Sequence, residues 1–513
     1  MNIKSAKEEI KNTVRAYLAR DDIGNFRISP IRQRPLLLMG PPGVGKTQII
    51  EQVAQECGVA LVAYTITHHT RQSAVGLPFI KEKTYAGRTR SVTEYTMSEI
   101  IASVYDKMEA TGLKEGILFI DEINCVSETL APTMLQFLQG KTFGNQKVPE
   151  GWIIVAAGNP PEYNRSVREF DVVTLDRIRR IDVEPDFAVW KEYAYRKSIH
   201  GAIISYLEIR RENFYRMETT PDGILFATPR GWEDLSEMIR VCEQLELPVG
   251  QELVLQYIQN PAVAKDFANY YELYKKYRND YRVDEILDGH FSDEAVTKLR
   301  LAPFDEKLSV IGLLLSRLND QFRQSYRIDQ YTEELFGKLR EWKEMLPGAM
   351  EAPDVLLQRL AQQMTDQLEL RKENRQAGSE EEWVQLRCIR KLESYAKALQ
   401  INEKREPDEA FAYVKEQFAQ EPELRKKEIS AASAALDHAF TFMATAFGES
   451  QEMVVFVTEL TVNFYSSKFI ADNGCDQYYV YNRGLLFAER QQGIMKEIDT
   501  LRAQENVDML QEQ

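Results

Sequence analysis

The sequence predicts an α/β domain with a parallel sheet, followed by a helical lid and a further all-α C-terminal region. Three observations support this fold class. Short apolar runs alternate with helical patterns over residues 1–184, which is typical of a parallel sheet with helices on both faces. A glycine-rich loop of the phosphate-binding type follows the first apolar run. From residue 185 on, the apolar runs stop and the sequence becomes helical and increasingly charged.

Each element of the α/β domain is expected from its own stretch of sequence. The strands correspond to apolar runs, which lie at residues 35–39, 59–64, 116–120, 152–157 and 178–183. Helical patterns occupy residues 1–18, 48–57, 93–108 and 130–138. Gly58 is a stop signal after the second of these helices.

The rest of the chain is expected to be helical. Residues 187–288 read as almost wholly helical, with breaks at residues 221–223 and at Pro229. Apolar residues recur on one helical face in residues 355–368. The expected domains are therefore a nucleotide-binding domain, a helical lid and a C-terminal region for partner or client binding, at residues 1–184, 185–289 and 290–513.

Composition limits the class of protein. The chain has 513 residues, more than one hydrophobic core usually serves. Its formal net charge of −15 argues against a nucleic-acid-binding protein whose whole surface is basic. A local basic channel is still compatible with this charge. Five scattered cysteines indicate reduced thiols and a cytoplasmic location. Since no apolar run approaches the length of a bilayer, we expect no membrane span.

The phosphate-binding loop is the strongest motif. A strand is expected before it and a helix after it, which an ordinary Gly/Pro turn would not require. Its glycines allow backbone N–H groups to approach phosphate oxygens. Its lysine can reach the β and γ phosphates of a nucleotide, and its threonine hydroxyl can bind Mg²⁺. The candidate nucleotide-binding residues are Gly40, Pro41, Pro42, Gly43, Val44, Gly45, Lys46, Thr47 and Gln48.

Two acids close the third expected strand. An acid at such a position can hold the Mg²⁺ shell, and a second can orient or deprotonate the attacking water. We assign Asp121 to the metal, together with Thr47, and Glu122 to the water. The alternative is a pair of solvated acids at a strand end, a common arrangement that the nearby phosphate-binding loop makes the weaker explanation.

Two further polar residues lie where they could reach the nucleotide. Asn159 follows the fourth expected strand, and its amide could contact the γ-phosphate or position the water with Glu122. The residues around it form turns readily, so a simple turn explains Asn159 equally well. Arg230 lies near an expected helix start and could contact phosphate from the lid. Its alternative is a solvated residue of the first helical turn.

Several arginines precede or enter the last expected strand. An arginine that reaches the γ-phosphate on a neighbouring subunit stabilises charge in the transition state. We choose Arg177 for this role. The rival donors are Arg165, Arg168, Arg179 and Arg180, and the alternative for all of them is a surface ion pair.

Taken together, these segments resemble the AAA+ ATPases, in particular the MoxR-like branch, a group of dynein-related AAA-type domains. The matching segments, in order, are GPPGVGKT, GILFIDEIN, AAGNP, LDRI and ATPRGWEDL. The resemblance covers residues 36–235 and, less closely, the stretch to residue 289. It implies that Lys46 and Thr47 belong to Walker A, and Asp121 and Glu122 to Walker B. It also implies that Asn159 is sensor 1, Arg177 the trans-acting finger and Arg230 sensor 2.

The sequence departs from the family pattern at two places. Residues 162–170 replace a simpler stretch before the finger, and Arg179 and Arg180 follow it where apolar residues are usual. These differences weaken the choice of Arg177. We assign no family resemblance to the region beyond residue 289 and expect it to carry the specific function.

The resemblance also implies partners. It implies hydrolysis of Mg·ATP between subunits of a homo-oligomeric ring, a hexamer, acting on a protein client, and a partner with a von Willebrand A domain. Residues 76–88 and 141–148 look like the inserted hairpins of this branch, which face a central pore in its ring-shaped members. Candidate residues for gripping a client are Phe79, Lys81, Tyr85 and Lys147. Two surface hairpins without clients are the alternative.

Other functions remain open from the sequence. A nucleotide-gated adaptor would use the long charged C-terminal helices to recruit partners, with incidental turnover. A nucleic-acid-linked motor is permitted by the basic residues of the first insert but disfavoured by the acidic balance. GTP is less favoured than ATP because no Asn-Lys-x-Asp guanine-reading motif is present.

Overall fold

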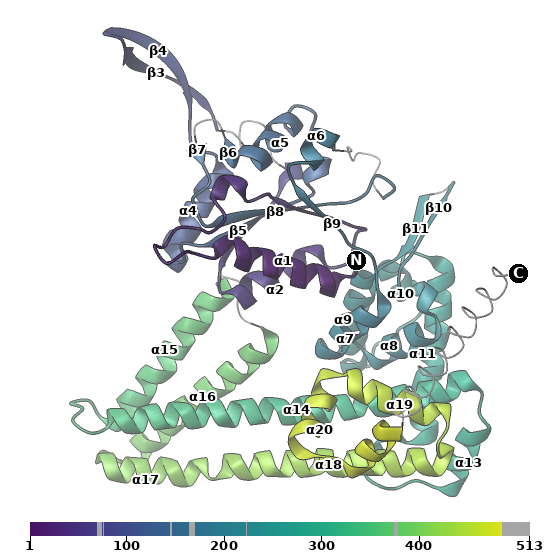
Figure 1. The fold of residues 1–513 in the computed structure, drawn as a ribbon. Helices are drawn as coiled ribbons and strands as arrows, with labels where there is room; N and C mark the ends of the chain where they lie inside the picture. Colours follow the sequence, from purple (N-terminus) through teal and green to yellow (C-terminus); the bar gives the residue numbers. More distant parts are fainter. Residues whose placement is uncertain are drawn as a thin grey trace, which may run out of the picture. The chain divides into compact units, whose positions relative to one another are not determined.

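The structure is a computed structural model that describes residues 1–68, 74, 76–143, 146–163, 170–221, 223–373 and 378–484 (Figure 1). The chain divides into two compact units. The first comprises Met1–Trp190, Thr228–Gly231 and Gln367–Gly378. The second comprises Lys191–Ala227, Trp232–Asp366 and Ser379–Gln513. The expected domain boundaries near residues 184 and 289 stay a prediction.

A parallel sheet forms the centre of the first unit. Its five strands lie in the order β2-β5-β8-β1-β9. Their bounds are β1 (Leu36–Met39), β2 (Ala60–Thr65), β5 (Gly116–Asp121), β8 (Trp152–Gly158) and β9 (Arg179–Asp182). Leu38 of β1 pairs with Ala157 on one side and with Ile181 on the other. Because all five strands are parallel, their carboxyl ends meet at one edge of the sheet.

Helices pack on both faces of this sheet, as the alternating pattern predicts (Figure 1). They are α1 (Ile3–Leu18), α2 (Lys46–Cys57), α4 (Glu99–Thr111), α5 (Ala131–Gly140) and α6 (Val172–Leu175). In β8, Val155 packs in the core formed with α1 and α2, whereas Ile154 packs in the core formed with α4 and α5. Gly58 ends α2 in the left-handed conformation that favours glycine. The predicted α/β fold class is confirmed.

The first insert is longer than the sequence suggested. Strands β3 (Pro78–Tyr85) and β4 (Arg88–Tyr95) pair as an antiparallel hairpin around the turn residues Ala86 and Gly87. Both turn residues have positive φ, as a two-residue hairpin turn requires. The helix expected at residues 93–108 is therefore wrong at its start, because residues 93–95 pair with residues 78–80. The helix α4 begins only at Glu99.

The second insert is a short hairpin, as predicted. Its strands are β6 (Thr142–Phe143) and β7 (Gln146–Lys147). The backbone N–H of Val148 donates to the carbonyl oxygen of Lys141 at 2.9 Å and closes its base. Phe143 is buried and stacks on Phe137 of α5, so the hairpin is fixed to the core of the first unit.

The elements after the sheet are mostly helical, in agreement with the expected all-α regions. Those before residue 289 are α7 (Phe187–Arg196), α8 (Gly201–Ile209), β10 (Arg216–Thr220), β11 (Gly223–Ala227), α9 (Pro229–Gln244), α10 (Gln251–Tyr257), α11 (Pro261–Tyr281) and α12 (Val283–Leu287). The later ones are α13 (Asp293–Leu301), α14 (Phe304–Met345), α15 (Pro353–Glu373), α16 (Ser379–Ile401), α17 (Pro407–Phe418), α18 (Gln420–Phe447), α19 (Gln451–Val462) and α20 (Phe464–Asn473). None of these described helices is long and apolar enough to cross a membrane.

One stretch of the expected helical lid is a hairpin instead. Strands β10 and β11 pair with Met217 opposite Phe226. Of the residues predicted to break a helix, 221–223, residue 222 lies outside the described residues, and Gly223 begins β11 opposite Thr220 with a positive φ. A break signal and a hairpin turn are given by the same residue types, which explains the misreading.

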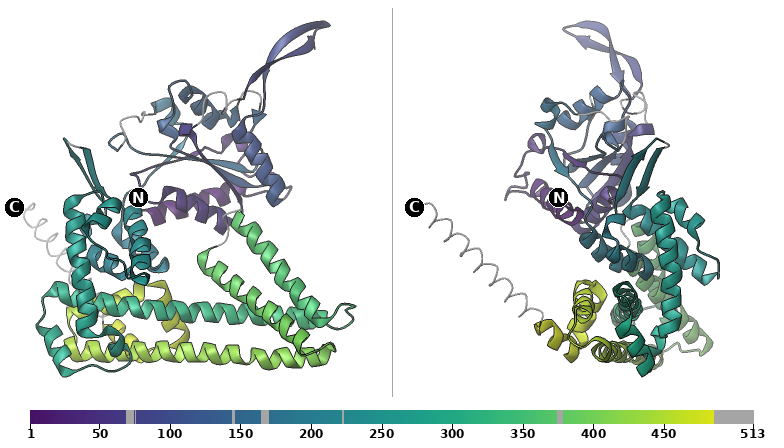
Figure 2. Two further views of the ribbon diagram at one scale, coloured as in Figure 1. Left: turned by 180° about the vertical axis from the view of Figure 1, so that it is seen from behind. Right: turned by 90° about the vertical axis from the view of Figure 1, so that its right-hand side faces the viewer.

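The helical unit is organised around α14, a helix of 42 residues. It packs along α18, α16 and α8, and Figure 2 shows α14 and α18 running side by side. A buried ionic cluster also holds helices together in this unit. The Lys191 ammonium lies 2.5 Å from Glu459 Oε1 and 2.8 Å from Glu208 Oε2, and the Tyr195 hydroxyl donates to Glu459 Oε2. This cluster joins α7 and α8 to α19.

Candidate nucleotide-binding site

The glycine-rich loop connects β1 to α2 at the carboxyl edge of the sheet. Gly43 and Gly45 have φ values of +80° and +91°, in the left-handed region that favours glycine. Gly40 must be glycine for a different reason. A Cβ there would lie 2.7 Å from the carbonyl oxygen of Val183. The loop can therefore keep this tight course only with glycine at these positions.

Lys46 lies at the start of α2 and is buried. Its ammonium donates to the carbonyl oxygens of Gly40 and Pro41 at 2.8 and 2.9 Å, and to Asn159 Oδ1 at 2.9 Å. Burial lowers the pKa of Lys46 to about 8, with Asp121 opposing this effect and Arg230 adding to it. The structure thus holds a partly desolvated cation at the mouth of the loop, which a phosphate group would stabilise.

Thr47 and Asp121 face each other across the sheet edge. The Thr47 hydroxyl donates to Asp121 Oδ2 at 3.0 Å, and the backbone N–H of Glu122 donates to Asp121 Oδ1 at 2.9 Å. A hydroxyl and a carboxylate are the hard oxygen ligands that Mg²⁺ prefers, so the two side chains fit a shared magnesium ion. No group of three or more His, Cys, Asp or Glu side chains that could hold a metal is present in the described ranges.

Glu122 adopts an unusual backbone conformation. Its φ of +56° lies in the left-handed region, which costs a non-glycine residue on the order of 1 kcal/mol. Such strain is often found at functional positions, where the surrounding structure fixes the direction of a side chain. The Glu122 carboxylate accepts a hydrogen bond from the Thr67 hydroxyl at 3.2 Å. Glu122 is therefore oriented at the end of β5, beside the residue that fits the metal.

Asn159 contacts Lys46 of the loop and is held in place by Asn124. Its side chain accepts from Lys46, and its backbone carbonyl accepts from Asn124 Nδ2 at 2.8 Å. Asn124 is buried, and its Oδ1 has no hydrogen-bond partner among the described residues. A Cβ on Gly158 would lie 2.5 Å from that oxygen, so only glycine fits between β8 and Asn124. This arrangement favours a positioned polar group over a simple turn.

Arg230 reaches the same neighbourhood from the start of α9. Its Cβ lies 3.6 Å from the position of a Cβ on Gly43, and Thr228 lies closer still. The Thr228 hydroxyl accepts from the backbone N–H of Gly231 at 3.2 Å, which fixes the first turn of α9. The Arg230 side chain is exposed. It therefore lies beside the loop with its guanidinium accessible to a ligand.

Arg177 does not join this cluster. Its guanidinium is exposed and donates to Gln139 Oε1 of α5 at 2.5 Å. Two rivals have partners in their own subunit: Arg179 pairs with Glu9, and Arg180 lies 2.8 Å from Asp182. The other rivals, Arg165 and Arg168, lie outside the described residues.

Sequence reasoning missed three residues of the site. Thr67, Asn124 and Thr228 orient Glu122, Asn159 and the start of α9. A short polar residue directly after a strand or before a helix was the only available signal, and such residues are common at both places. The remaining candidates lie on the loop or just after it: Pro41, Pro42 and Val44 belong to the loop, and Gln48 is exposed on α2.

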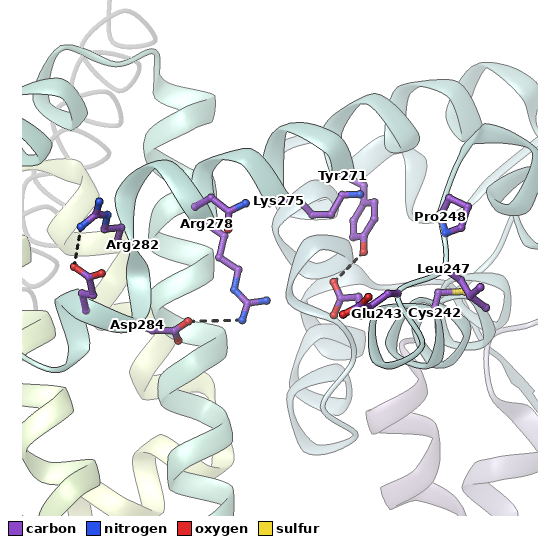
Figure 3. A pocket seen from close by; sticks show the side chains of 12 residues that line it. Cys242, Glu243, Leu247, Pro248, Tyr271, Lys275, Arg278, Arg282 and Asp284 are labelled. Carbon is purple, nitrogen blue, oxygen red and sulfur yellow. Dashed lines mark hydrogen bonds and ion pairs between the residues drawn. The ribbon is translucent and has the colours of Figure 1, made fainter.

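A separate hollow lies in the helical unit, between α9, α11 and α12 (Figure 3). Several of its side chains contact one another. Tyr271 donates to Glu243 at 2.9 Å, Arg278 lies 3.7 Å from Asp284, and Arg282 lies 3.4 Å from Glu285. None of the nucleotide-site candidates lines this hollow. It is therefore a feature of the second unit and no part of the nucleotide site.

The geometry defines a P-loop nucleotide site, and the comparisons assign the domain that carries it. Residues 36–177 match the ATPase family associated with various cellular activities (AAA). These residues, which include Lys46, Asp121 and Asn159, form an AAA ATPase domain. This family supports ATP hydrolysis as the general activity of the domain. Among curated proteins, no sequence matches the chain.

One solved structure with a likeness to this chain is a mutant of RuvB from Thermotoga maritima. The likeness covers 55% of this chain and 78% of that chain, with 14% sequence identity and a TM-score of 0.28. Similarity at this level adds nothing to the assignment of the fold or the function.

Proposed function

We propose that this chain is an AAA+ ATPase of the MoxR-like branch that hydrolyses Mg·ATP between subunits of a ring, a hexamer, to remodel or mature a protein client. One observation carries the proposal. Lys46, Thr47, Asp121, Glu122 and Asn159 come from three separate motifs, and hydrogen bonds link them at one edge of the sheet. Such convergence is expected of a hydrolytic site. A solvated turn without a function would not require these side chains to meet.

Each residue has a role that its chemistry supports. Lys46 would bind phosphate charge, and Thr47 with Asp121 would hold Mg²⁺. A bound Mg²⁺ would neutralise negative charge on the β and γ phosphates. Glu122 would orient or deprotonate the attacking water, and Asn159 would position that water or contact the γ-phosphate.

The ring part of the proposal rests on Arg177. An arginine that serves a neighbouring subunit must be exposed and need not contact its own site, and Arg177 meets both conditions. The ion pairs of Arg179 and Arg180 support Arg177 over these two rivals. Val172 and Val173, just before Arg177, are also exposed, as apolar residues at a contact between subunits would be in an isolated chain.

The client and the partners are carried over from the family resemblance. ATP turnover would move the lid, with Arg230 coupling it to the nucleotide, and a von Willebrand A domain protein would be a partner. The alternative is a nucleotide-gated adaptor, which the long charged helices of the second unit favour. Robust turnover stimulated by a client would count against the adaptor.

Two substitutions test the catalytic part. Lys46→Ala removes the phosphate-binding cation, so we expect loss of ATP binding. Glu122→Gln keeps the shape of the side chain but removes the base, so we expect ATP binding to persist and turnover to fall by roughly 100-fold or more. Binding is measured with a fluorescent ATP analogue, and turnover by phosphate release.

A matched control is available close to the site. Glu128 is exposed, lies shortly after β5 and is not one of the five residues of the cluster, so Glu128→Gln makes the same chemical change at another position. It should leave turnover unchanged. Normal turnover by Glu122→Gln would remove Glu122 from the mechanism, and ATP binding by Lys46→Ala would contradict the role of the loop.

A further inference from the structure

The β3–β4 hairpin separates its charges onto one face. The strand register places Lys83 opposite Arg90 and Tyr85 opposite Arg88. Because side chains alternate along a strand, one face carries Phe79, Lys81, Lys83, Tyr85, Arg88 and Arg90. We call it the cationic face. It has a single carboxylate, Glu94, and the opposite face has no lysine or arginine.

This face is open to a partner. All residues of β3 are exposed, and the hairpin extends away from the other elements of the first unit (Figure 1, Figure 2). Phe79 is 41% exposed and Tyr85 is 50% exposed, which is unusual for two aromatic rings on one small surface. Exposed rings rimmed by charge often mark an interaction site.

The cations differ in how they are engaged. Glu94 forms ion pairs with both Lys81, at 3.5 Å, and Lys83. Arg88 lies next to the turn and Arg90 lies opposite Lys83, and the side chains of both arginines form no ion pair or hydrogen bond with another described residue. The two arginines are therefore the groups best placed to bind an anion.

The spacing of these groups fits a nucleic-acid strand. Alternate residues of a β-strand lie about 6.6–6.8 Å apart. A stacked strand rises about 3.4 Å along its axis per nucleotide, so each step between cations corresponds to the axial rise of about two nucleotides. The rings of Phe79 and Tyr85, which flank the two lysines of β3, offer surfaces on which unpaired bases can stack. An acidic polypeptide would use the cations but would leave the rings without this contact.

We propose that the cationic face of the β3–β4 hairpin binds single-stranded nucleic acid. The acidic total of the chain does not oppose this, since the charge of the hairpin face is opposite to that of the molecule as a whole. The remaining acidic surface would instead restrict binding to the hairpin. The proposal goes beyond the proposed function, because it requires no ATP turnover.

The experiment measures binding of the full chain to labelled single-stranded DNA and RNA of about 16 nucleotides by fluorescence anisotropy, without nucleotide. Arg88→Ala with Arg90→Ala should weaken binding roughly tenfold at about 50 mM salt. It should also reduce the slope of affinity against salt, on logarithmic scales, by about 1.4. The matched control is Thr89→Ala with Ser91→Ala on the opposite face, which should change neither quantity.

Two more variants separate this proposal from simple loss of folding. Glu94→Gln frees Lys81 and Lys83 and should tighten binding roughly two- to fivefold, the range for release of an exposed ion pair. Tyr85→Ala should weaken binding without changing the salt slope, because stacking releases no counterions.

Three results would overturn the proposal. They are no binding of either oligonucleotide by the unmodified chain, unchanged binding by the double arginine variant, and polyglutamate binding as tight as that of the oligonucleotides. Because the assay contains no ATP, a failed ATPase proposal would leave its outcome unaffected, and the reverse also holds.

Discussion

At the scale of single residues, the site depends on a buried lysine whose charge is only partly compensated. Lys46 donates to two backbone carbonyls and one amide oxygen, which are neutral acceptors, and the nearest carboxylates act on it only from a distance. This explains why its pKa falls to about 8. It also explains how Lys46 can favour binding of a triphosphate. The bound anion supplies negative charge next to the ammonium, where the folded chain places only neutral acceptors.

This lysine predicts a pH dependence of ATP binding. Free Lys46 loses its proton above about pH 8, whereas a bound triphosphate raises its pKa, so the complex holds more protons than the free chain in that range. Affinity should therefore be full at about pH 7 and fall as the pH rises through 8, by up to roughly tenfold per unit. Titration of a fluorescent ATP analogue between about pH 7 and 9.5 measures this.

The chain offers a matched control for that titration. Burial lowers the pKa of Lys141 to about 8 as well, but this lysine contacts Gln33 outside the site. Lys141→Met should leave the pH profile unchanged. An affinity for ATP that stays constant over the whole range would show that Lys46 is not the titrating ligand of the phosphates.

At the scale of elements, the buried strands were the easiest to predict and the exposed ones the hardest. β1, β5 and β8 are buried on both faces, so each reads as a continuous apolar run. β4 is exposed, has no such run and leads directly towards α4, so its end was read as helix. β10 and β11 are short and only half-buried, and the helical pattern around them hides their alternation.

Site prediction had the same limit. The loop, the acid pair and Asn159 follow apolar strands at fixed places, so parallel topology alone predicts that they meet at one edge of the sheet. Thr67, Asn124 and Thr228 contribute through contacts that no local pattern specifies. Whether Arg177 acts in trans depends on a second subunit, which one chain cannot encode locally.

The helix packing of the second unit makes its own prediction. Burial lowers the pKa of Lys191, but Glu459 and Glu208 outweigh this and raise it. Glu459→Ala would remove a carboxylate partner from a buried ammonium, so we expect a loss of about 3 kcal/mol in the free energy of unfolding of this unit. Urea unfolding followed by circular dichroism measures it.

The comparison for this prediction is an exposed pair of the same type. Glu341 lies 2.9 Å from Lys338 on the surface of α14, so Glu341→Ala should cost less than about 1 kcal/mol. Equal effects of the two substitutions would mean that the buried cluster does not hold α19 to α7 and α8.

At the scale of the whole molecule, the proposed mechanism requires assembly of several subunits. The residues proposed to bind phosphate and to activate water belong to one chain, whereas Arg177 is exposed and donates to Gln139. A site completed by a neighbouring subunit should be nearly inactive in the monomer, because a missing finger removes charge stabilisation in the transition state. Turnover should therefore depend on protein concentration.

The proposal that Arg177 serves a neighbouring subunit is tested by ATP turnover per subunit, measured as a function of protein concentration together with the mass of the species present at each point. We expect the rate per subunit to rise with the fraction assembled and then to saturate, and we expect Arg177→Ala to assemble but to stay at the low rate. Full turnover at concentrations where the chain is monomeric would contradict this proposal, and so would absence of turnover from the assembled protein.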